Sequence, residues 1–577
     1  MIEAPQSDRL RVVLCWNMHQ PQYRDLVQGE PLRPWAYLRG IKDYVDMAVH
    51  LEAVPDACAV VNFSPVLLEQ LDDYASQLAA HLRSGAPVRD PVLALLTPDG
   101  VPADRSRWPD LVRSCLRAHP EHMIGRFPRY RELAGAFRRM LDSGSLADAA
   151  PESFADLAAW FHLAWFGETV RRGDPRVRAL LEREGHFTPA HLRLLLECVA
   201  DTLAGLIPRY RRLAGSGKIE LAVAPWGHPI LPLMFDFSAA READPDIELP
   251  ASASYPGGAD RARWHVARAI QAFSRTFGVR PRGCWPPEGA ISTATIELLE
   301  SFGFDWLASG ESVLQRSLTG AAGSRPSLAE SCGAYRVPGR QTACFFRNDE
   351  LSDLIGFSYA RMDGEEAAAD FVRRLEAMAS GNPDNSGRVV AVIIEGDAAW
   401  EYFPDNAHDF LRPLYERLTG HPRLRLTTFA RCLQEGVEIR QLDPLVAGSW
   451  IQGSLATWIG SPSRNHAWDL LCEAKRVFDQ VVVEGGLDEA GQRAAELQLG
   501  ACEASDWFWW LADYNPEDTV GGFDELYRRH LANLYRLLGE HVPAHLHGPI
   551  AHGGGSPPLG GAMLPAAGPG GHQDRDG

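Results

Sequence analysis

Six consecutive apolar residues, Val389 to Ile394, form the strongest strand signal in the chain. A run this short and this apolar, rich in β-branched residues, is typical of a strand buried on both faces, as in a parallel sheet. Segments with helical spacing separate most of the runs of this kind. The alternation predicts an α/β fold. The other such runs lie at residues 11–18, 57–63, 219–224, 304–308 and 343–349.

Two long stretches depart from this alternation. Residues 91–210 are rich in Leu, Ala and Arg and contain no convincing strand, which predicts a helical insertion. We expect a barrel-like α/β domain over residues 1–435 and a helical C-terminal domain over residues 436–550. Residues 551–577 hold thirteen Gly and Pro residues without periodicity and are expected to be disordered.

The composition argues against several classes of protein. A formal net charge of −18 argues against a nucleic-acid-binding protein, because neutralising phosphates requires clustered Lys and Arg. The ten cysteines form no CxxC pair and are expected to be reduced. The N-terminus is polar and no run of about 18 apolar residues is present, so we expect a cytoplasmic protein without a membrane partner. No nucleotide, zinc-protease or serine-hydrolase motif is present, so neither a cofactor nor a metal is expected.

Polar side chains follow the predicted strands. His19 and Gln20 come directly after the first strand, His228 closes a later one between prolines, and Asp353 lies in an acidic cluster beyond another. Because ligands bind at the carboxyl ends of parallel strands, these residues are candidates for one site. The alternative for each histidine is a hydrogen-bonded structural role.

Acidic residues mark the ends of two segments. The strongest strand leads into Glu395 and Asp397, which share a face if the strand continues through them. Repulsion between two such acids raises the pKa of one of them, which is how a carboxylic acid stays protonated to serve as a general acid. A solvated acidic turn is the alternative, although Trp400 follows closely. Glu288 lies between two prolines and a glycine, which indicates a side chain directed at a ligand.

Tryptophans accompany these acids. Trp faces stack on sugar rings, and residues 507–510 include three of them, although a core role for this cluster is at least as well supported. Two acids with aromatic platforms and no metal or phosphate motif are typical of glycosidic bond chemistry.

Five short segments, in this order, resemble those of glycoside hydrolase family 57, and the resemblance extends over residues 11–550. Residues 351–357 and 505–507 are also similar to the α-amylase-like branch of that family. The five segments are His19-Gln20-Pro21, residues 227–233, Trp285-Pro286-Pro287-Glu288-Gly289, Glu395-Gly396-Asp397 with Trp400-Glu401, and Trp450 through Trp458-Ile459-Gly460 to Asn465 and Trp468.

The resemblance implies an incomplete (β/α)7 barrel, followed by a helical domain that completes the cleft, acting on α-1,4-linked glucans without a metal. Glu288 matches the nucleophile of this retaining family, which forms a covalent glycosyl-enzyme while a second carboxyl group acts as acid and base. Substrate contacts are implied at His19, Gln20, His228, Trp285, Asp353, Trp400 and Trp458.

One position departs from the family pattern. The family's acid/base is an aspartate, but Glu395 stands there and Asp397 stands two residues later, so the two acid types are exchanged. A misplacement of about 1 Å can cost roughly 100-fold in rate. We predict Glu395 as the acid/base, because only the side-chain length has changed. Asp397 is the alternative acid/base.

We predict a retaining hydrolase of α-1,4-linked glucans. One alternative is an α-glucan transglycosylase, either a 4-α-glucanotransferase or a branching enzyme. The other is a weakly active or inactive glucan-binding homologue, because of the exchange at Glu395.

Overall fold

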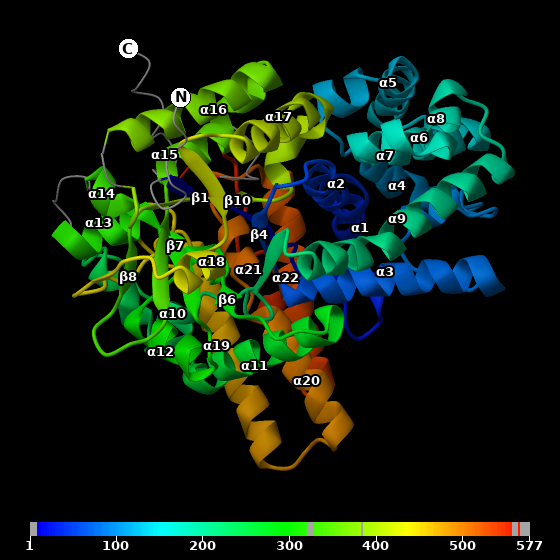
Figure 1. Cartoon of the computed structure of the whole chain (residues 1–577). Coiled ribbons are helices and arrows are strands. Elements are labelled where there is room, and N and C mark those ends of the chain that lie inside the picture. The colour runs from blue at the N-terminus through cyan, green and yellow to red at the C-terminus, as the bar shows by residue number, and fades with distance from the viewer. Residues whose placement is uncertain (1–8, 320–326, 382–384, 557–563, 566–577) are drawn as a thin grey trace.

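A computed structural model describes residues 9–319, 327–381, 385–556 and 564–565 of the chain. Within these residues, seven parallel strands form a nearly closed barrel in the order β5-β4-β1-β10-β9-β7-β6 (Figure 1). The predicted fold class is confirmed. The strands are β1 (Leu10–Met18), β4 (Ala59–Phe63), β5 (Ile219–Val223), β6 (Gly283–Cys284), β7 (Trp306–Gly310), β9 (Ala343–Arg347) and β10 (Val389–Glu395). Short strands flank them: β11 (Leu424–Thr427) pairs with β1, β8 (Ala334–Arg336) pairs with β9, and β12 (Ile439–Gln441) pairs with β8.

Six of the seven barrel strands coincide with the apolar runs of the sequence. The prediction missed β6, because it has two residues and is followed by Pro286 and Pro287. Gly283 is needed there, since a Cβ atom would lie only 2.0 Å from the ring of Trp306 on the neighbouring strand. The strand that leads to Glu288 is therefore defined by a close contact between strands rather than by an apolar run.

Strand register sets three polar residues side by side. β1 lies between β10 and β4, with Asn17 opposite Glu395 on one side and opposite Asn62 on the other. All three residues are near the carboxyl ends of their strands. Helices surround the barrel: α1 (Trp35–Arg39), α2 (Val45–Ala53), α3 (Pro65–Ser84), α10 (Leu231–Phe235), α11 (Gly258–Phe277), α12 (Thr293–Ser301), α13 (Glu311–Thr319), α15 (Asp349–Asp353), α16 (Gly364–Ser380), α17 (His408–Thr419) and α18 (Phe429–Gln434).

Residues 91–210 contain helices and no strand, and they form a lobe beside the barrel (upper right in Figure 1). The last helix of this lobe packs on α3, and its aromatic helix α6 is buried nearly throughout. The longer helices are α4 (Trp108–Cys115), α5 (Pro128–Ser143), α6 (Pro151–Trp165), α8 (Pro175–Glu182) and α9 (Pro189–Gly215).

The C-terminal region is also helical. Its helices are α19 (Pro462–Val483), α20 (Glu489–Cys502), α21 (Ser505–Trp510) and α22 (Glu517–Leu537), and α19 and α20 project as a hairpin at the lower edge of Figure 1. Among the described residues, no helix has the length and apolar character needed to cross a membrane. All ten cysteines are buried and free. Much of the tail predicted to be disordered, residues 557–563 and 566–577, lies outside the described residues.

Candidate active site

A cleft of about 590 Å³ lies at the carboxyl ends of the barrel strands. Five of the predicted site residues reach it from three parts of the chain: His19, Gln20, Glu288, Glu395 and Asp397. Asp506, at the start of α21, lines it from the C-terminal region. The barrel and the C-terminal helices therefore build the site together.

Glu288 is half-buried and has a left-handed backbone, with φ of 59° and ψ of 21°. A non-glycine residue in this conformation costs of order 1 kcal/mol or more, so contacts must hold it there. Trp450 provides two of them: its backbone N–H donates to the carbonyl of Glu288 at 3.1 Å, and its indole N–H donates to Oε2 at 2.9 Å. Burial, and next the Asp506 carboxylate, raise the pKa of Glu288 to about 7. The Trp450 hydrogen bond and His19 oppose this rise.

Glu395 ends β10 and is also half-buried. The side-chain amide of Asn17 donates to both of its carboxyl oxygens, at 3.1 Å each. Burial raises the pKa of Glu395 well above its ordinary value, and Asp397 and Glu288 raise it further. These surroundings favour the protonated form of Glu395, and Glu395 is close enough to Glu288 for the two groups to interact.

Asp397 has a different environment, although it is only two residues away. Its side chain is buried and accepts hydrogen bonds from Gln20 at 2.7 Å, from the Tyr44 hydroxyl at 2.7 Å and from the backbone N–H of Ala398 at 2.5 Å. Donors of this kind stabilise the ionised carboxylate. The charge of Asp397 lies close enough to Glu395 to raise the pKa of Glu395.

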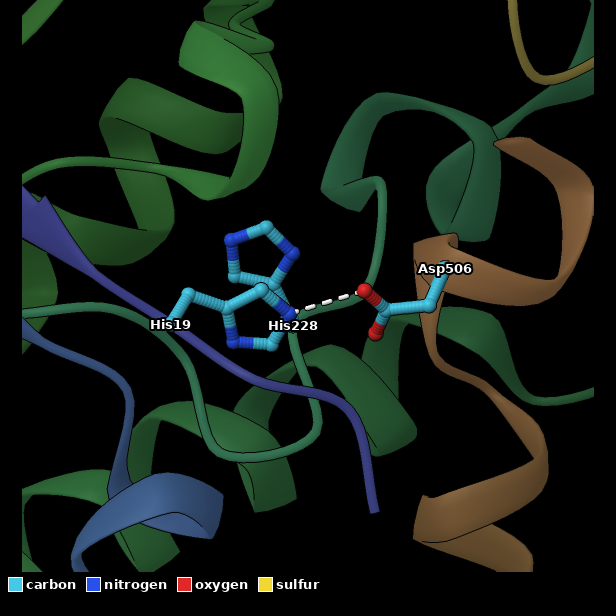
Figure 2. Close-up of side chains that lie close together, drawn as sticks. All are labelled: His19, His228 and Asp506. Carbon is cyan, nitrogen blue, oxygen red and sulfur yellow. Dashed lines mark hydrogen bonds and ion pairs between the residues drawn. The ribbon is translucent and has the colours of Figure 1, made fainter. Parts of the chain in front are cut away.

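His19 and His228 stack with their ring centres 3.6 Å apart and an angle of 9° between the rings (Figure 2). His19 Nε2 lies 2.9 Å from Asp506, and the Nδ1 atoms of the two rings lie 2.8 and 2.9 Å from the hydroxyls of Ser64 and Ser505. Burial, and then the proximity of His19, lower the pKa of His228 well below its ordinary value. Within the described part of the chain, His228 Nε2 and Asp506 Oδ2 are buried without a hydrogen-bond partner.

The donor atoms of His19, His228 and Asp506 lie within 4.8 Å of one another, as metal ligands would. However, a ring nitrogen binds a metal along its in-plane lone pair, and the two rings are nearly parallel. An ion in the plane of one ring would lie outside the plane of the other. In this orientation the cluster suits hydroxyl groups better than a metal ion, and buried unpaired polar atoms beside a cleft are available to a polar ligand.

Five of the seven predicted substrate contacts do not line the cleft. Trp285, Trp400 and Trp458 are at most 1% exposed and do not line the cleft. Asp353 is likewise absent from the cleft wall, and it accepts a 2.6 Å hydrogen bond from Arg347. His228 lies behind His19. The prediction was based on sequence position, but large indoles fill the interior, where they bury the most apolar surface.

The sequence reading missed several residues of the cleft wall. Arg347, the last residue of β9, donates to Asp349 at 2.8 Å and to Asp353 at 2.6 Å, and its guanidinium lies 5.2 Å from the ring centre of Trp450. Its position at a strand end was the available signal. The three-tryptophan segment has both roles that were considered, since Trp507 is buried and the other two line the cleft. The aromatic residues of the wall are Tyr23, Trp35, Phe357, Tyr402, Trp450, Trp509, Trp510 and Phe523.

A family model described as glycosyl hydrolase family 57 matches residues 13–441, well over half of the chain. The chain belongs to glycosyl hydrolase family 57. It is therefore an enzyme that acts on glycosidic bonds. A search of curated proteins gave no match.

Solved structures of family 57 enzymes share the fold. A branching enzyme from Thermococcus kodakaraensis is 15% identical, with 92% of this chain and 90% of that chain covered and a TM-score of 0.56. The α-amylase AmyC from Thermotoga maritima is 12% identical, with coverages of 92% and 93% and a TM-score of 0.54. A branching enzyme from Pyrococcus horikoshii is 16% identical, with coverages of 96% and 99% and a TM-score of 0.53.

Proposed function

We propose that this family 57 enzyme cleaves α-1,4-linked glucans with retention of configuration, using Glu288 as nucleophile and Glu395 as acid/base. The observation that carries the proposal is that one cleft holds two carboxyl groups, each with its own hydrogen-bond donor: the Trp450 indole for Glu288 and the Asn17 amide for Glu395. Burial raises the pKa of both groups, that of Glu288 to about 7, and the Asp397 and Glu288 charges raise the pKa of Glu395 further. Environments that separate two carboxyl pKa values assign the carboxylate and the acid.

The chemistry then follows in two steps. The Glu288 carboxylate attacks the anomeric carbon while Glu395 gives its proton to the glycosidic oxygen, so that the leaving sugar departs and a glycosyl-enzyme forms. The resulting Glu395 carboxylate takes a proton from water or from a sugar hydroxyl, whose oxygen attacks the same carbon and releases Glu288. Hydrolysis and transfer differ only in this acceptor.

The cleft wall supports a glucan as substrate. Several aromatic faces line it, among them Trp35, Trp509 and Trp510, and such faces stack on sugar rings. His19 and Asp506 contribute polar atoms next to Glu288. The solved relatives are an α-amylase and branching enzymes, and we extend the α-glucan substrate to this chain.

The exchanged acids are assigned by their hydrogen bonds. Asp397 accepts from three donors, whereas Glu395 accepts from one amide and keeps a raised pKa. A carboxyl group whose oxygens already accept from three donors is poorly placed to give a proton to a substrate, so we assign proton transfer to Glu395 and a supporting role to Asp397.

The test is incubation with maltoheptaose and amylose, with products followed by chromatography and the anomer first formed identified by proton NMR. We expect an α-anomer from the parent protein, a loss of at least about 1,000-fold in Glu288→Gln, and a loss of about 100- to 10,000-fold in Glu395→Gln. New reducing ends indicate hydrolysis, and redistribution of chain length without them indicates transfer. If neither glucan yields any product, that result contradicts the proposal. Activity that survives in Glu395→Gln but not in Asp397→Asn moves the acid/base role to Asp397.

A further inference from the structure

Two buried amides lie between the proposed acid/base and the segment that carries the nucleophile. Asn17 and Asn62 are 1% and 0% exposed, and strand register places them in line with Glu395 across β10, β1 and β4. Residues in register on neighbouring parallel strands point to the same face, so the three side chains meet inside the barrel.

The hydrogen bonds between them run in one direction. The backbone N–H of Trp285 points to Asn62 Oδ1 at 3.4 Å, Asn62 Nδ2 donates to Asn17 Oδ1 at 2.8 Å, and Asn17 Nδ2 donates to Glu395. Because its oxygen already accepts from Asn62, the Asn17 amide cannot turn over without losing that bond. Asn17 therefore faces Glu395 with its N–H donor and not with its oxygen.

We propose that Asn17 is a positioning residue that sets how far Glu395 reaches into the cleft, with Asn62 locking its orientation. The inference rests on the proposed function. Glu395 has one more methylene and one more rotatable bond than an aspartate would have at this position. Rotational freedom of a reacting group lowers the reaction rate, because the group spends less time in the productive orientation. A donor shared by both carboxyl oxygens holds the carboxyl group back against the barrel and removes that freedom.

The same series of hydrogen bonds relates the two carboxyl groups to each other. It ends on the backbone of Trp285, three residues before Glu288. The β6 segment and the β10 strand end are thus joined through the barrel interior by side chains of β1 and β4.

The electrostatic role of Asn17 has a definite sign. The titratable groups that act on or face Glu395 are Glu288, Asp397, Asp506 and the buried Cys15 thiol. The three acids raise the pKa of Glu395, and the Asn17 donor opposes them. Loss of Asn17 therefore moves the alkaline limb of activity, where Glu395 loses its proton, to higher pH.

The experiment compares kcat/KM for maltoheptaose and for α-maltosyl fluoride in Asn17→Ala, Asn62→Ala and the parent protein. Fluoride leaves with little need for a proton, so a defect in the acid affects the first substrate far more than the second. For Asn17→Ala we expect a loss of about 10- to 100-fold on maltoheptaose, a loss below about 3-fold on the fluoride, and the upward shift of the alkaline limb. Asn62→Ala, which keeps the donor but frees it to turn, should show a smaller loss of the same pattern.

Asn385→Ala is the matched control, since Asn385 is a buried asparagine with two hydrogen bonds on the segment before β10. It should leave the ratio of the two kcat/KM values and the alkaline limb unchanged. Equal losses on both substrates, or an alkaline limb that stays in place in both Asn17→Ala and Asn62→Ala, would overturn the proposal. If Asn17→Ala does not fold, Asn62→Ala decides alone. A parent protein inactive on both substrates refutes the proposed function instead.

Discussion

Glu395 and Asp397 show how far two acids of one short segment can differ. Glu395 lies half-buried at the cleft with a single amide donor, and its pKa is raised. Asp397 is buried, accepts from Gln20 and Tyr44, and caps the turn that follows it. The two groups differ in their hydrogen-bond partners, a difference that side-chain length alone would not produce, and the proposed roles of acid/base and supporting group follow from it.

Asp397→Asn tests this separation. Asp397 raises the pKa of Glu395, so removing its charge should lower that pKa and move the alkaline limb of kcat/KM down by about 1 pH unit. The measurement is a pH profile on maltoheptaose. Asp518→Asn serves as control, because Asp518 is an exposed acid that also lines the cleft, and its profile should match that of the parent. An unmoved or rising limb in Asp397→Asn would contradict the assignment.

At the scale of elements, the proposed nucleophile, Glu288, is held by the loop that follows the barrel. This loop pairs with the Glu288 segment through a β-bridge between Gly448 and Ile291. Trp450 donates hydrogen bonds to both the backbone carbonyl and the carboxylate of Glu288. The loop approaches β7 so closely that a Cβ atom on Gly310 would lie 2.5 Å from the backbone of Trp450. Close packing on several sides fixes where the indole donor points.

Trp450→Phe removes that donor while keeping an aromatic ring. The Trp450 hydrogen bond holds down the pKa of Glu288, which is about 7, so its loss should raise that pKa and shift the acid limb of kcat/KM to higher pH. Since Glu288 must be ionised to attack, activity at pH 6 should fall by about 10-fold for every whole pH value by which the limb moves. Trp510→Phe, which alters a cleft aromatic stacked on Phe523, should leave the acid limb in place. The idea fails if both variants shift the limb equally.

At the scale of the whole molecule, a buried ionic cluster joins the C-terminal helices to the barrel. Glu503, just after α20, accepts from Arg261 and His265 of α11 at 2.7 Å and also from the Tyr255 hydroxyl. Burial alone would raise the pKa of Glu503, but Arg261 and His265 outweigh it and hold the pKa at about 2. The next turn carries Asp506 into the cleft, so this cluster also anchors the active site.

Glu503→Gln should destabilise the protein by about 3–5 kcal/mol, because it leaves Arg261 buried without its partner charge. Chemical denaturation at pH 7 measures the difference. The folded-state pKa lies below that of an unfolded glutamate, so the contribution is present above about pH 4.3 and is lost as the pH falls toward 2. The exposed pair Glu489–Arg493 supplies the control, and Glu489→Gln should change stability by less than about 0.5 kcal/mol. Equal effects of the two substitutions would show that the cluster stabilises nothing.

The sequence by itself determined the strands, their alternation with helices and the acids at their ends. Apolar periodicity is local, so runs such as Val389 to Ile394 could be read directly. The same local reading located Glu288 and Glu395. It missed β6, whose two residues have no periodicity. It also assigned Trp285, Trp400 and Trp458 to the cleft wall, whereas all three are buried in the interior.

Only the tertiary structure decided what each polar group touches. Asn17 and Glu395 are 378 positions apart in the chain, and their hydrogen bond exists because strand register aligns them. Likewise, Trp450 reaches Glu288 from 162 positions away, and Asp506 reaches His19 from 487. Protonation and reach depend on such partners, because burial and neighbouring charges set a pKa and packing sets a side chain's position. Neither is encoded in the spacing of residues along the chain.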